Sequence, residues 1–263
     1  MRKGRSGVRT REGGRPLCLI TGGARRIGAA IARHLAPGFD LAIHYNRSAG
    51  EADALLPELK AAGAHAESFQ ADFAEPEQAA TLVRAVAGAM GPIDLVVNSA
   101  SVFEYDVPSD FSASKMAGLL GVNLVAPMVV AREFAAHASD RAVLVTMLDN
   151  KVFAPNPDFF SYSLAKFALK GAVDMLALHF RGRMRVCAIA PGVTLPSGDQ
   201  SEENFRRSWR HSLTGTGASP QDIAAAVAFI WNTASLNGAT IVLDGGQRLM
   251  SLERDVAFVM EAK

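Results

Sequence analysis

The stretch Leu17-Cys18-Leu19-Ile20-Thr21-Gly22-Gly23-Ala24-Arg25-Arg26-Ile27-Gly28 decides the fold. Its four leading apolar residues are typical of a strand that is buried on both faces. The glycines let the backbone turn tightly and approach a pyrophosphate, and the helix expected from residue 26 turns its positive N-terminal end toward phosphates. A glycine pattern alone is weak evidence. Here it lies at the first strand–helix junction, where a dinucleotide-binding turn has to lie.

Apolar runs and helical patterns alternate along the rest of the chain. Strands are predicted at 17–20, 41–44, 65–70, 95–98, 142–147, 186–190 and 240–243, and helices at 26–36, 49–62, 76–90, 114–138, 161–181 and 219–232. Gly63 is placed to end the second helix, and Ser219-Pro220 to begin the last one. The alternation predicts an α/β fold: a single Rossmann-type, doubly wound, seven-stranded and mostly parallel sheet with helices on both faces.

The length of 263 residues fits one large domain, which we place at 16–250. Residues 1–15 form a glycine-rich basic arm that is expected to be flexible, because it has almost no apolar residue to bury. Residues 251–263 form a C-terminal tail, for which a subunit interface is one location. The irregular segment 191–218, with a charged helical piece near 201–211, is either a lid over the site or a plain surface loop.

The bulk properties exclude several function classes. A net charge of +1, with no aromatic residues in the basic arm, argues against nucleic acid as a partner. Neither a secretory signal nor a membrane-length apolar run is expected, so we predict a cytoplasmic protein. Cys18 and Cys187 lie in apolar runs and are expected to be buried free thiols, and the six histidines lack metal-ligand spacing.

The end of the second strand predicts which nicotinamide cofactor binds. A site for NAD usually carries an acidic residue there, to bond the ribose 2′-hydroxyl. This chain instead has His44-Tyr45-Asn46-Arg47-Ser48, in which Arg47 and Ser48 offer a cation and a hydroxyl to a 2′-phosphate. The expected cofactor is therefore NADPH.

Tyr162 and Lys166 form the candidate catalytic pair. Their i,i+4 spacing places both side chains on one helical face. A tyrosine with a pKa near 10 is a poor acid–base group at neutral pH, and a neighbouring ammonium is expected to lower the pKa of Tyr162.

Together, the glycine turn and the Tyr-x-x-x-Lys pattern resemble the short-chain dehydrogenase/reductase family, with Arg26 replacing the middle glycine of the family turn. Asn98-Ser99-Ala100-Ser101 resembles the family's Asn-Asn-Ala-Gly segment, and Asn123 falls in an intervening helix. Ordinary members carry a serine thirteen residues before the tyrosine, where this chain has Asp149. An ionised carboxylate accepts hydrogen bonds but cannot donate one to a carbonyl substrate.

Arg26, Asp149 and the His44–Ser48 stretch together resemble the pteridine reductases, a subgroup of that family, over residues 16–249. The subgroup also has a phenylalanine shortly after Asn-x-Ala-Ser, which Phe103 matches. The resemblance implies that the catalytic residues are Asp149, Tyr162 and Lys166, and that the substrate contacts are Arg26, Ser101, Phe103, Asp149 and Tyr162. It implies cofactor contacts from Gly22, Arg25, Arg26, Ile27, Gly28, Asn46, Arg47, Ser48, Asp72, Phe73, Asn98, Ala100, Ser101, Asn123, Lys166, Pro191 and Gly192.

The expected function is NADPH-dependent reduction of a pterin or folate, in which Asp149, Tyr162 and Lys166 relay the proton. A flat pterin fits between the Phe103 ring and the nicotinamide. Two alternatives stay open: an NADPH-dependent carbonyl reductase acting on a 3-oxoacyl-type or sugar substrate, and a non-enzymatic NADP(H)-binding sensor. The resemblance also implies a homotetramer, in which a C-terminal residue of one subunit can enter a neighbour's active site.

Overall fold

The computed structural model describes residues 14–250 and 252–261, and residues 1–13 of the basic arm lie outside it. Seven strands form one sheet in the order β3-β2-β1-β4-β5-β6-β7, and every neighbouring pair is parallel. The strands are β1 (Leu17–Thr21), β2 (Asp40–Tyr45), β3 (Ala66–Gln70), β4 (Ile93–Asn98), β5 (Ala138–Met147), β6 (Arg185–Pro191) and β7 (Thr240–Leu243). The predicted Rossmann-type fold with seven strands is confirmed.

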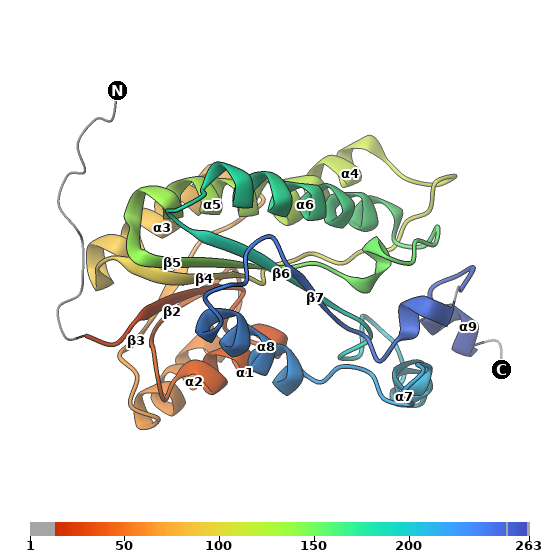
Figure 1. Ribbon diagram of the computed structural model, residues 1–263. Helices are drawn as coiled ribbons and strands as arrows, with labels where there is room; N and C mark the ends of the chain where they lie inside the picture. The colour runs from red at the N-terminus through yellow and green to blue at the C-terminus, as the bar shows by residue number, and fades with distance from the viewer. Residues whose placement is uncertain (1–13, 251, 262–263) are drawn as a thin grey trace.

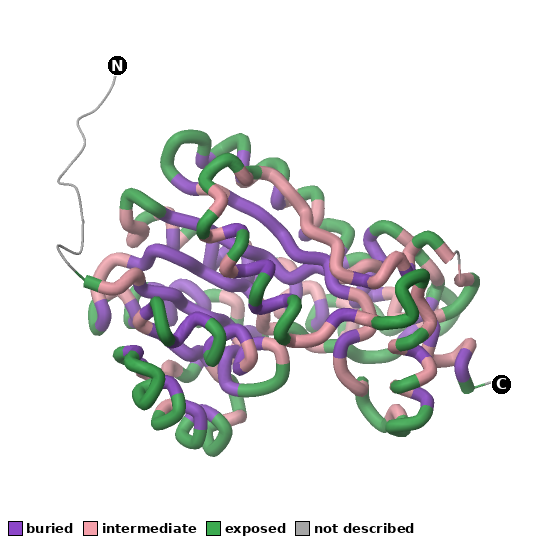
Figure 2. Tube along the Cα trace, turned by 60° about the horizontal axis from the view of Figure 1, so that its bottom comes forward, coloured by how far each residue is buried: buried purple, intermediate pink, exposed green. Residues whose placement is uncertain are grey.

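Helices cover both faces of the sheet (Figure 1). One layer holds α1 (Arg26–Leu35), α2 (Ala49–Ala61) and α8 (Pro220–Asn232), and the other holds α3 (Glu77–Met90), α4 (Ala113–Leu120), α5 (Ala126–His137) and α6 (Phe160–His179). Each layer packs its own apolar cluster against the sheet. The central strands are therefore buried, while the outer helix faces are exposed (Figure 2). Such strands contain continuous apolar runs, as the sequence does.

The predicted helix 114–138 differs in its centre. α4 and α5 are joined by a π-helical turn, Gly121–Val125, which contains Asn123. Single π-turns of this kind are frequent at functional sites. The stretch Ala113–His137 also has the length and hydropathy of a membrane span, contrary to our expectation, with a mean hydropathy of 1.5 in its most apolar window. Val130 and Phe134 of this stretch belong to the core beside β4, and 33% of the most apolar window is buried.

The boundaries agree with the cap residues expected from the sequence. Gly63 has a φ of 94° after α2. Ser219 begins α8 with a complete capping box, in which its hydroxyl accepts from the Asp222 N–H and the Asp222 carboxylate accepts from the Ser219 N–H. The predicted charged helix near 201–211 is α7 (Glu202–Arg210), and α9 (Val256–Glu261) packs against it.

The order of the sheet reverses between β1 and β4, whose ends pair as Thr21 with Asn98. Ligands of open parallel sheets bind beyond the carboxyl ends of strands at such a switch point. Here the Thr21 hydroxyl accepts from the Ser99 and Ala100 N–H groups, both at 3.0 Å. It thereby ties the loop after β4 to the glycine turn after β1.

His44 fixes the glycine turn from the other side. Its Nδ1 accepts from the Gly22 N–H at 3.0 Å, so Nε2 carries the proton and donates to the Ala71 carbonyl at 3.1 Å. The imidazole also stacks on the Phe73 ring, with centroids 4.3 Å apart. Burial lowers the pKa of His44 from 6.5 to about 4, so the ring is neutral at pH 7.

This burial predicts that acid weakens the fold. The unfolded chain takes up a proton on His44 near pH 6.5 and the folded chain only near pH 4, so stability is lost as pH falls through that window. Lowering the pH from 7.5 to 5 should cost about 2 kcal/mol of the free energy of unfolding through this residue. Urea unfolding of the wild type, His44→Asn and the exposed control His34→Ala measures it. The wild type and His34→Ala should both lose this free energy of unfolding between pH 7.5 and 5, and His44→Asn should not. An equal loss in all three proteins would contradict the assignment.

Candidate active site

Asp149, Tyr162 and Lys166 meet at the carboxyl end of the sheet. Asp149 follows β5, and the other two lie on the first turns of α6. The Tyr162 hydroxyl donates to Asp149 Oδ2 at 2.9 Å, and Lys166 Nζ donates to the Met147 carbonyl at 2.8 Å. Asp149 Oδ1 accepts from the Lys151 N–H at 2.9 Å, which fixes the carboxylate. The structure therefore brings together the three predicted catalytic residues.

The electrostatics differ from the sequence expectation. Burial and the neighbouring Asp149 carboxylate raise the pKa of Tyr162 well above 10, so the prediction that Lys166 lowers it is wrong. Lys166 Nζ lies 5.4 Å from the centroid of the Tyr162 ring but donates its hydrogen bond to the Met147 carbonyl. Burial lowers the pKa of Lys166 to about 8. Burial raises the pKa of Asp149. Tyr162 is consequently a neutral hydroxyl donor whose partner, Asp149, is able to carry a proton.

A second group of residues forms a cradle with the shape that a dinucleotide needs. Gly22 has a φ of 62°, and a Cβ there would lie 2.9 Å from the Ala100 Cα. A Cβ at Gly28 would lie 2.2 Å from the Gly22 carbonyl oxygen, so the turn and α1 can approach this closely only with glycine. The N-terminal end of α1 opens into the same cavity, where it favours phosphate.

The distal end of the cradle matches the adenosine side of NADP(H). Asn46, Arg47 and Ser48 line the cavity after β2. Asn46 Nδ2 donates to Asp72 Oδ1 at 3.0 Å, so the two predicted contacts hold one another in place. The end of β2 carries no acidic residue, whereas an NAD site has one at that position. The guanidinium of Arg47, which follows β2, suits a 2′-phosphate instead.

One cavity of about 1230 Å³ joins the cradle to the catalytic residues. This exceeds the roughly 300–1,000 Å³ of most single-ligand sites, which leaves space for a cofactor and a substrate together. Nearly all predicted site residues line it: Gly22, Arg25, Arg26, Ile27, Gly28, Asn46, Arg47, Ser48, Asp72, Phe73, Ala100, Ser101, Phe103, Asp149, Tyr162, Lys166, Pro191 and Gly192. Segment 191–200 forms one wall of it, as a lid would.

Asn98 and Asn123 are the exceptions, because both are buried behind the cavity wall and do not line it. Asn123 Oδ1 accepts from the Ser101 hydroxyl and the Val102 N–H, both at 2.9 Å, and its Nδ2 donates to the Val102 carbonyl at 2.8 Å. Its position in the π-turn thus shapes the loop that carries Ser101 and Phe103. Asn98 Nδ2 donates to the Pro127 carbonyl at 3.4 Å. In this structure they support the site rather than face a cofactor.

Arg26 has a φ of 54°, in the left-handed region that glycine adopts most readily. Its guanidinium donates to the Pro196 carbonyl at 2.8 Å across the cavity. The residue thereby joins the turn to segment 191–200. Phe159, just before α6, has a φ of 56°. Among the described residues these two are the only non-glycines with positive φ, and both line the cavity.

Phe103 contacts the ring of Tyr162. The two ring centroids are 4.7 Å apart at 90°, and Phe159 stacks on Phe103 with centroids 4.0 Å apart. Phe103 is 39% exposed, so part of its surface remains available to a flat substrate. Sequence reasoning found Phe103 but missed Phe159, because no residue pattern announces a positive-φ position before a helix.

Other supporting residues also escaped the sequence analysis. Asp106 accepts from the Ser161 N–H at 2.9 Å and from its hydroxyl, and so holds the first turn of α6 beside Tyr162. Lys151 was the one with a usable signal in the sequence, because a charged residue only two positions after the predicted catalytic Asp149 influences its carboxylate.

The model for the short chain dehydrogenase family matches residues 17–206. The chain belongs to the short-chain dehydrogenase/reductase family. Within it, the chain is similar to the pteridine and folate reductase-like subgroup. The structure of FolM alternative dihydrofolate reductase 1 from Brucella canis, complexed with NADP, is 37% identical, with a TM-score of 0.85 and coverage of 89% of this chain and 94% of that one. That complex agrees with the NADP(H) cofactor expected from Arg47 and Ser48.

Two curated relatives show the breadth of the family. Pteridine reductase 1 from Leishmania tarentolae is 28% identical, over 89% of this chain and 96% of its own length. D-threitol dehydrogenase from Mycolicibacterium smegmatis is 30% identical, over 88% of this chain and 92% of its own length. The family and its oxidoreductase chemistry are therefore established, and the substrate is left to the residues of the site.

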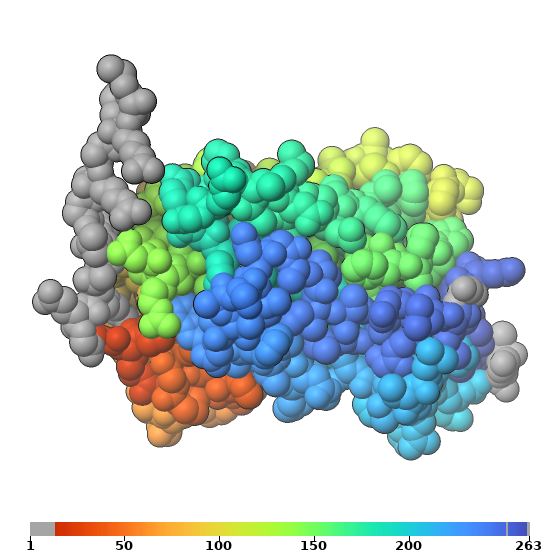
Figure 3. Space-filling view, viewed as in Figure 1, coloured from red at the N-terminus to blue at the C-terminus, as the bar shows by residue number. Residues whose placement is uncertain are grey.

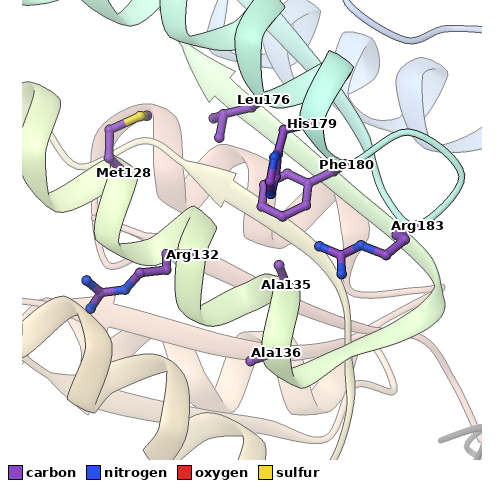
Figure 4. A pocket seen from close by; sticks show the side chains of 8 residues that line it. All are labelled: Met128, Arg132, Ala135, Ala136, Leu176, His179, Phe180 and Arg183. Carbon is purple, nitrogen blue, oxygen red and sulfur yellow. The ribbon is translucent and has the colours of Figure 1, made fainter. Parts of the chain in front are cut away.

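A second, smaller hollow lies between α5 and α6 on the outer helical layer (Figure 4). Its lining consists of Met128, Arg132, Ala135, Ala136, Leu176, His179, Phe180 and Arg183. It contains none of the predicted site residues, and we assign it no chemistry.

The lowered pKa of Lys166 predicts an alkaline limit to turnover. As pH rises through about 8, Lys166 loses its charge and no longer favours the anionic state of the Asp149–Tyr162 pair left after proton donation. The kcat should therefore fall about tenfold per pH unit above this limb. In Lys166→Arg the guanidinium stays charged, so the pH above which kcat falls should be higher than in the wild type. This pH is measured on the activity that the variant retains. A limb that stays near pH 8 in Lys166→Arg would assign it to another group.

Proposed function

We propose that this protein is an NADPH-dependent reductase of pterins or folates. The observation that carries the proposal is the hydrogen bond from Tyr162 to Asp149, at the position where ordinary family members have a serine. A carboxylate there suits a ring with N–H groups and repels a carbonyl oxygen that gains negative charge. The similarity to FolM and to pteridine reductase 1 supports the same class.

In the proposed reaction, a C=N bond of the heterocycle gains a hydride at carbon and a proton at nitrogen. NADPH, when bound, supplies the hydride. Tyr162 and Asp149 hold the proton, and Asp149 with its raised pKa takes up the replacement from solvent. Lys166 stabilises the negative charge that is left on the pair after the proton has gone. Phe103 orients the flat ring, and Arg26 bonds a pterin oxygen or ring nitrogen.

We also propose that the protein forms a homotetramer. α6 exposes Leu164, Phe167, Met175 and Leu178 along its outer surface, where the last two are 71% and 77% exposed. An apolar stripe of this kind favours contact with another subunit. The cytoplasmic location and the three-part division of the chain remain predictions from the sequence.

A substrate panel tests the function. With NADPH, dihydropterins or dihydrofolate should be reduced, which is followed by the loss of absorbance at 340 nm. Asp149→Asn should lower kcat by about a hundredfold or more, because general acid–base groups contribute at least that much, and it should leave NADPH binding intact. The exposed control Asp140→Asn should behave as the wild type.

The panel also separates the alternatives. Turnover of a simple ketone or sugar without turnover of any pterin or folate would replace the proposal with carbonyl reduction, which the similarity to D-threitol dehydrogenase keeps in view. Tight NADPH binding with no turnover at all would favour a sensor.

Arg47 predicts the cofactor preference. Arg47→Ala should raise the KM for NADPH by about tenfold or more, since a charge-assisted bond to phosphate is lost, and should leave the KM for NADH nearly unchanged. Steady-state kinetics with both cofactors measures it, with the exposed Arg33→Ala as control. A parallel rise for both cofactors would mean that Arg47 does not contact the 2′-phosphate.

A further inference from the structure

Residues 252–261, here called the C-terminal segment, lie across one end of the active-site cavity. Its helix α9 packs against α7 at the same end of the molecule (Figures 1 and 3). Asn204 of α7 donates to the Ala257 carbonyl at 2.8 Å. Leu252, Asp255, Val256, Ala257, Phe258 and Glu261 line the cavity. The segment thus completes the site of its own chain.

A buried carboxylate latches the segment in place. Asp158 has no exposed side-chain surface, and Arg254 donates to both of its oxygens, with contacts of 2.7 and 2.8 Å. The Asp255 N–H donates to Asp158 Oδ2 at 2.7 Å, and the Tyr105 hydroxyl donates to Oδ1 at 3.2 Å. An ionised carboxylate is costly to bury without a partner. The ion pair with Arg254 therefore stabilises both the buried Asp158 and the position of the segment.

A second ion pair joins the segment to the catalytic loop. Lys151 Nζ lies 2.7 Å from Asp255 Oδ2 and donates to the Asn156 side chain at 3.0 Å. Both Lys151 and Asp158 belong to the stretch between Asp149 and Tyr162. The segment is therefore fixed to the loop that carries the proposed proton relay.

Aromatic rings extend the wall from the catalytic tyrosine to the segment. Phe258 lies parallel to Phe159, with centroids 6.2 Å apart, and meets the edge of Tyr105 at 5.2 Å. Phe159 in turn stacks on Phe103. A substrate ring on Phe103 would therefore direct any long side chain either around this wall or against it.

The charges at this end disfavour an anion. The cations Lys151 and Arg248 line it but are already paired, with Asp255 and Asp244, both at 2.7 Å. Asp199 and Glu261 line it too, and neither has an ion pair among the described residues. A glutamate tail would bring two further carboxylates to this surface. Like charges in a partly buried site are strongly unfavourable, whereas a neutral hydroxylated side chain meets only polar acceptors.

We propose that the C-terminal segment sets the specificity of the site in cis: it admits pterins with a short uncharged side chain and excludes the aminobenzoyl-glutamate of folates. The inference rests on the proposed function. Arg254 acts as a positioning residue through Asp158, and Phe258 is the wall that the side chain of the substrate meets.

Binding to the complex with NADP⁺ tests the proposal without turnover. Calorimetric titration with 6-hydroxymethylpterin and with folic acid gives a ratio of affinities for the wild type, Arg254→Ala, Phe258→Ala and the control Arg33→Ala. The control loses an exposed ion pair with Glu58, and neither residue of that pair lines the cavity. The wild type and the control should prefer the pterin by about tenfold or more, and each of the other two variants should reduce that preference by about tenfold.

Each outcome decides the question. A wild type that binds both ligands equally, or a preference that survives in every correctly folded variant, would overturn the inference and leave the proposed function standing. A wild type that neither binds nor reduces either compound class would overturn both. Circular dichroism reports folding, and Phe258→Ala decides if Arg254→Ala fails to fold, because it removes no charge.

Discussion

The site depends on one constraint, the parallel alignment of β1, β4, β5 and β6. Parallel strands bring their carboxyl ends to one edge, so the glycine turn, the Ser99–Phe103 loop, Asp149 and Pro191 meet there although they are far apart in sequence. Hydrogen bonds from these backbone segments to the Thr21 hydroxyl and the His44 imidazole then fix the positions of the glycine turn and the loop after β4. Both are buried: His44 satisfies one N–H group of the glycine turn, and Thr21 satisfies two in the loop after β4.

Burial governs the chemistry as much as position does. Tyr162 and Lys166 are buried and Asp149 is half-buried, and each shift in pKa favours the neutral form of the group concerned. A neutral tyrosine bonded to a carboxylate is an arrangement for holding a proton, whereas a phenolate beside an ammonium is one for removing it. The replacement of serine by Asp149 therefore changes the character of the pair that the family shares.

The sequence was sufficient for the features that depend on local patterns. Apolar runs and glycines predicted the sheet and the helices, and the spacing of Asp149, Tyr162 and Lys166 predicted their meeting. It was insufficient where packing decides. Solvent exclusion reversed the expected direction of the Tyr162 pKa, and Asn123 lies behind the wall because a π-turn directs it there. The ion pair of Arg254 with Asp158 joins residues 96 positions apart, which no local pattern reports.

The two positive-φ residues, Arg26 and Phe159, place backbone strain in the wall of the cavity. Non-glycine residues in that region cost about 1–3 kcal/mol each, and the remainder of the structure has to hold them there. A glycine at residue 26 would relieve the strain but would remove the side chain that bonds the Pro196 carbonyl of segment 191–200. At residue 26, stability and the contact across the cavity therefore favour different residues, and both strained backbone positions lie in the cavity wall.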